Sequence, residues 1–167
     1  MSVSIFRPAV ILLTALLFLP LLSGCSDEPE VSKVVGAPLQ AFHLNSENHS
    51  EFIVLLVNDY LDSNEKLIQH YAEFRKANDV QGFIAYRNES WTPEYMRRKE
   101  FYQQMLHRNK AYAYRHQING LFDRFMDLQK LSLHLKHSLQ NSDANLAAQV
   151  MEKLTADEKA VTASLTN

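Results

Sequence analysis

After residue 50 the apolar residues repeat every three to four positions, which is the period of an α-helix. The chain has only four glycines and five prolines, so few residues interrupt this pattern. We therefore predict an all-α fold whose first helix runs from Ser50 to Ala77. A break at Asp62, with Glu65 completing a capping box, is the alternative. The apolar residues of this helix that share one sector are Ile53, Leu56, Val57, Tyr60, Leu61, Leu67, Ile68, Tyr71 and Phe74.

The segment from Asn78 to Trp91 is predicted to be a connection. Asn78, Asp79 and Gly82 favour turns, and the residues 83–86 (Phe-Ile-Ala-Tyr) favour an extended segment. Thr92, Pro93 and Glu94 then combine a hydroxyl cap, a first-turn proline and an acid, which predicts a helix start. This second helix is expected to run to about Ile118.

Two more helices are predicted toward the C-terminus. The apolar sector rotates by roughly 120° after Asn119-Gly120, which indicates a stop and a new helix, although one long helix is the alternative. The last helix follows Asn141-Ser142-Asp143, and Thr155 with Glu158 resembles a capping box that would split it. The expected architecture is an antiparallel bundle of about four helices over residues 49–167, with a longer first loop.

The N-terminus has the pattern of a secretory signal. Arg7 is followed by an uncharged apolar run from Pro8 to Leu22, and small residues come next. The run is shorter than the roughly 20 apolar residues that a membrane span needs. It also contains Pro20, which disfavours a helix near its end.

The sequence Leu22-Ser23-Gly24-Cys25 resembles the lipobox of bacterial lipoproteins. The resemblance implies transfer of diacylglycerol to the Cys25 thiol, cleavage between Gly24 and Cys25, and acylation of the new amino terminus. Cys25 is the only cysteine of the chain, so the folded part has no disulfide. Two or more acyl chains anchor a protein stably to a bilayer.

These features divide the chain into a signal peptide (1–24), a lipidated N-terminus and flexible tether (25–48) and a helical domain (49–167). A tether of this length reaches about 25 Å. Ser26 follows the lipidated cysteine where enteric-type lipoproteins retained in the inner membrane have aspartate. The expected location is therefore the outer membrane, facing the periplasm, and the inner membrane is the alternative.

Charge and motifs exclude several functions. The chain has 17 basic and 19 acidic residues, and removal of Arg7 leaves a mature net charge of about −3. Together with export, this argues against a nucleic-acid partner. The sequence has no P-loop, Rossmann, Gly-x-Ser-x-Gly or His-Glu-x-x-His motif. We expect a non-catalytic protein without a cofactor.

One surface is predicted to bind a partner. Residues 93–116 have six basic residues against Glu94 and Glu100, and the spacing of Arg97, Arg108 and Arg115 places them on one side of a continuous helix. Arginine and tyrosine are frequent anchors in interfaces, so these residues with Tyr102 and Tyr112 form the candidate site for an acidic partner. The alternative is a solvated basic face above core tyrosines.

Two further candidates are weaker. His134 and His137 lie one turn apart, but nearby Lys130 disfavours a cation, so no metal site is predicted. Trp91 in the first connection is a candidate for a ligand pocket, against a packed hydrophobe. The function expected first is a lipid-anchored helical module that binds another envelope protein. The alternatives are a small-ligand binder or enzyme with a pocket near Trp91, and an immunity or inhibitor protein against a periplasmic toxin.

Overall fold

The computed structural model describes residues 43–166, and these residues form helices without a β-strand. The signal peptide, Cys25 and most of the predicted tether lie outside the described residues. No helix within 43–166 combines the length and the apolar character that crossing a membrane requires. In chain order the helices are α1 (His49–Ala77), α2 (Val80–Tyr86), the π-helical turn η3 (Arg87–Trp91), α3 (Thr92–Arg108), α4 (Lys110–Arg115), α5 (Asn119–Gln140) and α6 (Ala144–Ala163).

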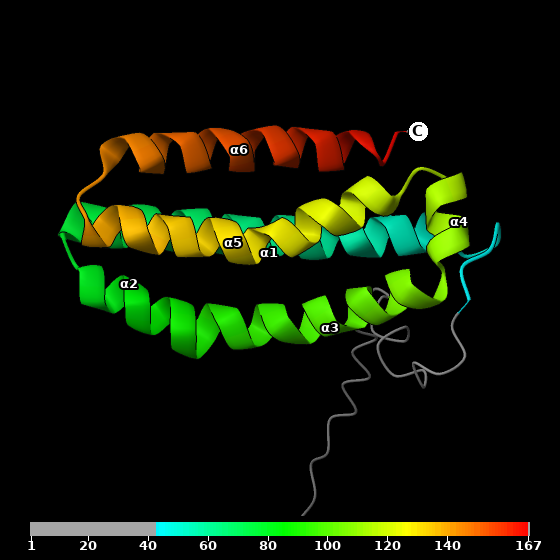
Figure 1. Cartoon of the computed structure of the whole chain (residues 1–167), viewed down its shortest axis with the longest axis horizontal. Coiled ribbons are helices and arrows are strands. Elements are labelled where there is room, and N and C mark those ends of the chain that lie inside the picture. Colours follow the sequence, from blue (N-terminus) through cyan, green and yellow to red (C-terminus); the bar gives the residue numbers. More distant parts are fainter. Residues whose placement is uncertain (1–42, 167) are drawn as a thin grey trace, which may run out of the picture. The chain divides into compact units, whose positions relative to one another are not determined.

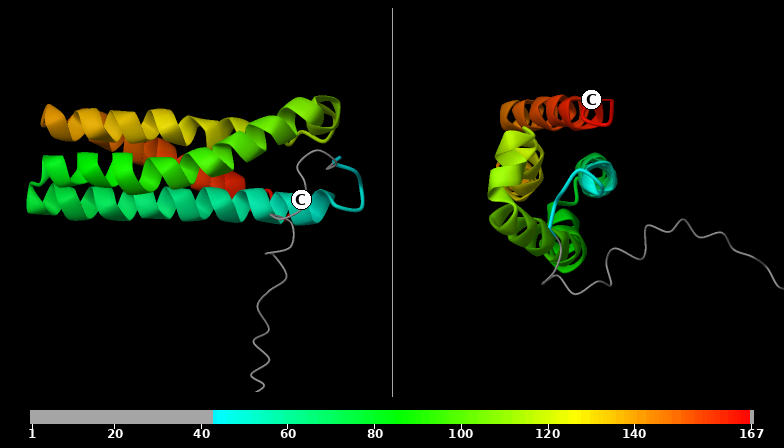
Figure 2. Two further views of the ribbon diagram at one scale, coloured as in Figure 1. Left: turned by 90° about the horizontal axis from the view of Figure 1, so that it is seen from below. Right: turned by 90° about the vertical axis from the view of Figure 1, so that its right-hand side faces the viewer.

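The long helices of the described region run alternately in opposite directions (Figure 1). Helices α1 and α5 pack against each other in the middle, and α6 covers them on one side. The run of α2, η3 and α3 packs against α1 and α5 on the other side, as the end-on view of Figure 2 shows. The predicted all-α antiparallel bundle is therefore confirmed.

Helix α1 is one uninterrupted helix, as predicted, because its apolar stripe stays in phase through Asp62. Leu56, Val57, Tyr60 and Leu67 on this stripe are all 1% exposed or less. The helix ends at Asn78, whose left-handed backbone (φ 54°) lets its N–H donate to the carbonyls of Arg75 and Phe74. The alternative break at Asp62 does not occur.

The prediction of a connection over residues 78–91 was wrong. Asp79 caps α2 by accepting a hydrogen bond from the Gly82 N–H at 2.8 Å. A Cβ on Gly82 would lie 2.2 Å from Asp79 Oδ2, so the residue read as a turn signal is required inside a capped helix. Phe83 and Trp91 are buried in the core, and their packing outweighs the local turn and strand preferences.

Helix α3 begins at Thr92 as predicted, with Pro93 and Glu94 in its first turn, but the predicted hydroxyl cap is absent and α3 follows the helical turn η3 instead of a loop. Trp91 and Thr92 both have right-handed helical angles, and no side chain caps the start of α3. The wider turn of η3 lies directly before Pro93. In a regular helix the ring of Pro93 would clash with the carbonyl four residues earlier, and a wider turn relieves that contact.

The second predicted helix is interrupted before Ile118. Helix α3 ends at Asn109, which is 5% exposed and donates its side-chain amide to the Met105 carbonyl. The short helix α4 follows and points away from α3 (Figure 1). Gln117 then reverses the chain with φ 57°, and Asn119-Gly120 begins α5 instead of ending the preceding helix.

The C-terminal helix begins as predicted. The Asp143 carboxylate accepts a hydrogen bond from the Leu146 N–H at 2.9 Å and caps α6. Thr155 and Glu158 do not split α6, which is continuous to Ala163. Its buried residues Val150, Leu154 and Val161 keep one helical phase, so the packing of α6 on α1 and α5 is uninterrupted.

The core between the helices is rich in aromatic rings. Trp91 stacks on Tyr95 with centroids 4.8 Å apart, and Tyr95 stacks on Phe125 at 5.4 Å. Tyr102 makes an edge contact with Phe125 at 4.8 Å. These rings join η3 and α3 to α5, so the π-helical turn is fixed by core packing.

Candidate functional site

The three arginines of the predicted partner-binding surface do not share one helix. Arg97 lies on α3, Arg108 is the last residue of α3, and Arg115 is the last residue of α4. All three are exposed. Their predicted alignment requires a continuous helix, which the break at Asn109 removes. That these arginines bind a partner stays a prediction, but they do not form a single stripe.

The predicted tyrosine anchors differ from each other in exposure. Tyr102 is 0% exposed, and its hydroxyl donates to Asp59 Oδ2 at 2.6 Å, so it is a core residue and not a surface anchor. Tyr112 is half-buried, stacks on His116 and has its hydroxyl 3.2 Å from His49 Nδ1. The neighbouring Tyr114 is 58% exposed and is the tyrosine of α4 that faces solvent.

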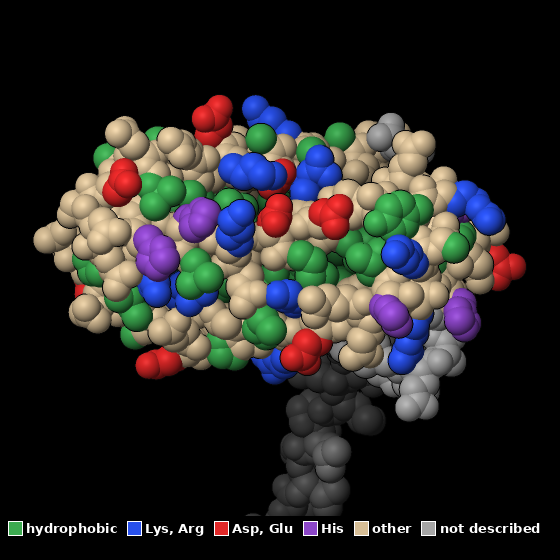
Figure 3. Space-filling view, viewed as in Figure 1, with side chains coloured by type: hydrophobic (Ala, Val, Ile, Leu, Met, Phe, Trp, Pro, Cys, Tyr) green, Lys and Arg blue, Asp and Glu red, His purple; other side chains and the backbone are tan. Residues whose placement is uncertain are grey.

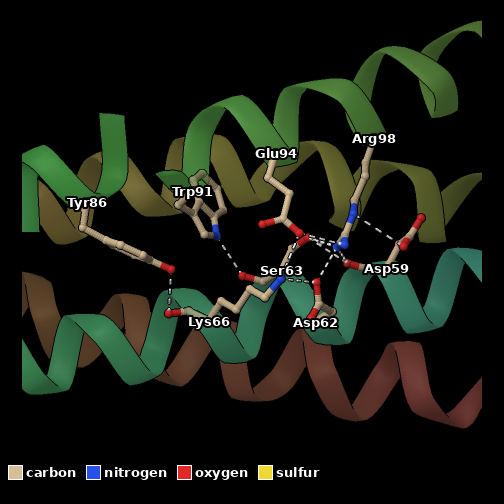
Figure 4. A network of polar contacts seen from close by, with 8 residues as sticks. All are labelled: Asp59, Asp62, Ser63, Lys66, Tyr86, Trp91, Glu94 and Arg98. Atoms are coloured by element: carbon tan, nitrogen blue, oxygen red, sulfur yellow. Dashed lines mark hydrogen bonds and ion pairs between the residues drawn. The ribbon is translucent and has the colours of Figure 1, made fainter. Parts of the chain in front are cut away.

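The most extensive polar cluster lies between α1 and α3 (Figure 4), and we call it the α1–α3 ion-pair network. Arg98 donates to Asp62 Oδ2 at 2.7 Å and to Glu94 Oε1 at 2.9 Å, and its Nε lies 3.6 Å from Asp59 Oδ1. Lys66 Nζ bridges Glu94 and Asp62 at 2.8 and 3.0 Å. Three carboxylates thus meet two cations, and each carboxylate has a charged partner.

The network stabilises the charged forms of Asp62 and Lys66. Burial alone would raise the pKa of Asp62, but hydrogen bonds from Lys66 and Arg98 outweigh it and leave that pKa below its ordinary value. Hydrogen bonds to Glu94 and Asp62 raise the pKa of Lys66. Groups stabilised in their charged forms are poor proton donors or acceptors near neutral pH. The arrangement is suited to joining two helices.

Trp91 lies beside this network (Figure 4) and does not line any of the three hollows described below. It is 2% exposed, and its indole N–H donates to the Ser63 carbonyl at 2.9 Å (Figure 4). Phe83 is fully buried. Tyr86 donates to the Lys66 carbonyl, and burial raises its pKa to about 12. The aromatic residues of the predicted first loop therefore hold α2 and η3 against α1.

The histidine pair on α5 has no completing ligands. His137 is exposed and His134 half-buried, and residues 43–166 contain no group of three or more His, Cys, Asp or Glu arranged to hold a metal ion. Figure 3 shows the face formed by α6, α5 and the α2–α3 run, where acidic, basic and histidine side chains are interspersed.

The largest hollow among those that the structure describes is an open groove between α1 and α6, which we call the α1–α6 groove. Its volume is about 640 Å³, against 450 and 270 Å³ for hollows at the two ends of the bundle. Leu61 and Ile68 supply its apolar surface and are only partly covered by the core. Its other lining residues are Glu65, Gln69 and Glu158.

Polar side chains are buried next to this groove. Asn64 is 0% exposed; its amide donates to Glu158 Oε2 at 3.1 Å, while its Oδ1 has no hydrogen-bond partner within residues 43–166. The buried Tyr60 hydroxyl likewise has no partner in this part of the chain, and burial followed by the charges of Asp157 and Glu158 raises its pKa. Asp157 is 4% exposed and pairs with Lys153 and Arg124. Buried polar groups of α1 and α6 therefore lie beside the groove.

These clusters were not predicted from the sequence, although the sequence shows the ion pairs within each helix. Glu94 with Arg98 and Asp62 with Lys66 have the four-residue spacing of helical ion pairs. Their meeting across helices depends on tertiary packing. Arg87 was also missed: it is 6% exposed, donates to Ser132 Oγ at 3.0 Å and Asn88 Oδ1 at 2.9 Å, and has no carboxylate partner within residues 43–166.

Comparisons of the chain with protein-family models, with curated proteins and with solved structures give no match.

Proposed function

We propose that this protein is a lipid-anchored, non-catalytic helical module that binds another protein of the bacterial envelope through the α1–α6 groove. The groove is the observation that supports the proposal best, because it is the largest described hollow and has apolar side chains open to solvent. The sequence Leu22-Ser23-Gly24-Cys25 supports the lipid anchor. Ser26 supports an outer-membrane location facing the periplasm.

The shape and charge of the groove define the partner segment that fits it. Leu61 and Ile68 are seven residues apart, which is two helical turns, so they present an apolar strip along α1. Glu65 and Glu158 add negative charge on the two opposite helices. An amphipathic helix with apolar residues on one face and Lys or Arg at its edges complements both features.

A photoreactive residue in place of Gln69 tests the groove in the native envelope. Gln69 lines the groove, whereas Ala148 is exposed on α6 and is not among the lining residues, so Ala148 is the matched control position. We expect one envelope protein to crosslink from position 69 and not from position 148. Equal crosslinking from both positions would contradict a specific groove.

Charge reversal then tests the chemistry with the purified partner. Glu65→Lys is expected to weaken binding by about tenfold, because it places a cation opposite the basic edge of the partner helix. Glu152→Lys makes the same charge change at an exposed position that does not line the groove, and should leave binding unchanged. A partner peptide that binds without basic residues would contradict the proposed complementarity.

The anchor is tested at Cys25. Cys25→Ser removes the acceptor thiol, so metabolic labelling with a palmitate analogue should be lost and uncleaved precursor should accumulate. For sorting, Ser26→Asp should move the protein toward the inner-membrane fraction of an enteric-type host. Wild-type protein found wholly in the inner membrane would contradict the outer-membrane assignment.

A further inference from the structure

The chain enters the bundle at the corner between α3 and α4. Leu44 is 5% exposed, and its N–H donates to Asn109 Oδ1 at 2.9 Å, although residue 44 lies in the segment predicted to be a tether. Asn109 is the residue that separates α3 from α4. The first described residues of the chain, 43 and 44, therefore lie beside α4 (Figure 1).

This corner has a concentration of positive charge. Residues 101–122 contain no Asp or Glu, and Arg108, Lys110 and Arg115 within them are exposed. Lys110 and Arg115 form no ion pair with any residue between 43 and 166, unlike Arg98 and Lys66. In Figure 3 several blue and purple side chains lie at this end of the bundle, with a red one at its edge.

An exposed aromatic ring lies among these cations. Tyr114 is 58% exposed, and the Lys110 ammonium lies 5.9 Å from the centre of its ring. Tyrosine is favoured at the boundary between lipid and water, because its ring is apolar and its hydroxyl remains hydrated. We call Arg108, Lys110, Tyr114 and Arg115 together the α4 corner.

We propose that the α4 corner contacts the anionic phospholipid surface in which Cys25 is anchored, so that the bundle is held with its α4 end toward the membrane. The inference rests on the lipid anchor of the proposed function and adds an orientation to it. Two acidic residues, Glu47 and Glu51, also lie at this end of the bundle. They belong to α1 and the turn before it, whereas Lys110 and Arg115 belong to α4.

The length of the connecting chain makes a weak contact sufficient. Residues 26–42 separate Cys25 from the first described residue, and a chain of this length spans at most about 60 Å. Such tethering raises the effective concentration of the surface to about the millimolar range. Each Lys or Arg near an anionic surface strengthens binding by roughly fivefold. The three cations of the α4 corner therefore give a weak affinity for the surface, which is sufficient at the effective concentration that the tether provides.

A fluorescent probe at the α4 corner tests the contact in the full acylated protein. Because Cys25 is the only cysteine and is consumed by lipid, Tyr114→Cys creates a unique thiol for labelling. The protein is reconstituted in phosphatidylcholine vesicles with about one-third phosphatidylglycerol and a headgroup quencher. We expect strong quenching at position 114 that falls in pure phosphatidylcholine and in high salt.

The opposite end of the bundle supplies the control. Asn145→Cys places the probe at an exposed position near the start of α6, and it should be quenched several-fold less. Lys110→Glu with Arg115→Glu should lower the quenching of a probe at position 114 to the level measured at position 145. Lys130→Glu with Lys159→Glu makes the same charge change at exposed positions on α5 and α6 and should leave the quenching at position 114 intact.

The outcomes separate this inference from the anchor. Protein that floats with the vesicles but shows equal quenching at positions 114 and 145 would overturn the orientation and leave the anchor standing. Protein that does not float would overturn the lipid anchor, and the orientation with it. Quenching at position 114 that is unaffected by Lys110→Glu with Arg115→Glu would overturn the electrostatic contact.

Discussion

Arg98 and Arg115 are 17 positions apart in the chain, yet they lie in opposite surroundings. The Arg98 side chain is 24% exposed and pairs with Asp59 and Asp62 of α1 and with Glu94 of its own helix α3. Arg115 is exposed at the end of α4, and no carboxylate in the described part of the chain pairs with it. The charge of Arg98 joins two helices, whereas the charge of Arg115 is open to an external anion.

The comparison shows why local charge is a poor guide to a binding surface. Residues 93–116 are basic as a segment, but Arg98 among them is paired with Asp59 and Asp62 of α1, which lie far away in the sequence. Beyond Glu100 no acid follows until Asp123, and the cations of α4 lack such partners among the described residues. We therefore expect changes in the α1–α3 ion-pair network to affect stability, and changes at the α4 corner to affect binding alone.

The largest effect on stability is expected at the buried edge of the network. Trp91→Ala removes a ring that stacks on Tyr95 and an N–H that bonds to Ser63. Loss of a large buried aromatic side chain costs about 3–5 kcal/mol. Urea unfolding followed by circular dichroism measures this change. A loss below about 1 kcal/mol would show that Trp91 is not part of the core.

An intermediate effect is expected from the network itself. Arg98→Met keeps most of the side-chain length but leaves Asp59, Asp62 and Glu94 with fewer cations, so the free energy of unfolding should fall by about 1–2 kcal/mol. Arg115→Met is the matched control, since Arg115 has no described ion pair to lose, and it should change stability by less than about 0.5 kcal/mol. Equal losses in both variants would remove the distinction between the two arginines.

How far sequence predicts this structure depends on whether the signal is local. Helix α1 was predictable because Leu56, Tyr60 and Leu67 repeat with the helical period over many turns. The continuous helical run from α2 through η3 to α3 could not be predicted, because Gly82 and Pro93 locally disfavour helix. The burial of Phe83 and Trp91 overrides these preferences, and it depends on tertiary packing.

The candidate sites show the same division. Exposure of Arg97, Arg108 and Arg115 agrees with their predicted surface role, but their alignment failed because Asn109 ends α3 through its own side-chain hydrogen bond. The burial of Tyr102 agrees with the alternative of core tyrosines, and not with a tyrosine anchor on the surface. The α1–α6 groove could not be predicted, because its lining residues come from two helices at opposite ends of the domain's sequence.

A smaller effect is expected from pH. The pKa of Asp62 in the folded protein lies below its ordinary value of 3.8, so its ion pairs stabilise the fold above that value and are lost as the pH falls through the folded pKa. Lys66 has the opposite sign: its pKa is raised above 10.5, so its contribution is full below that value and is lost as the pH rises through the folded pKa. Denaturation of wild type and Asp62→Asn should therefore show a stability gap at neutral pH that narrows under acid. A gap of constant size would contradict the ion pairing of Asp62.

The smallest effect on stability is expected at the α4 corner. Lys110→Glu with Arg115→Glu reverses two exposed charges that have no ion-pair partner among the described residues, and exposed charges contribute on the order of 0–1 kcal/mol even when paired. Arg115 at the C-terminal end of α4 interacts favourably with the helix dipole, so Arg115→Glu is slightly destabilising. An acid at position 110, the N-terminal end, is slightly stabilising, so the two effects on stability oppose each other. We expect the free energy of unfolding to change by less than about 0.5 kcal/mol, while the vesicle contact is lost. A stability loss similar to that of Arg98→Met would show that the charges of the α4 corner stabilise the fold, as those of the α1–α3 ion-pair network do. It would contradict a role of these charges in binding alone.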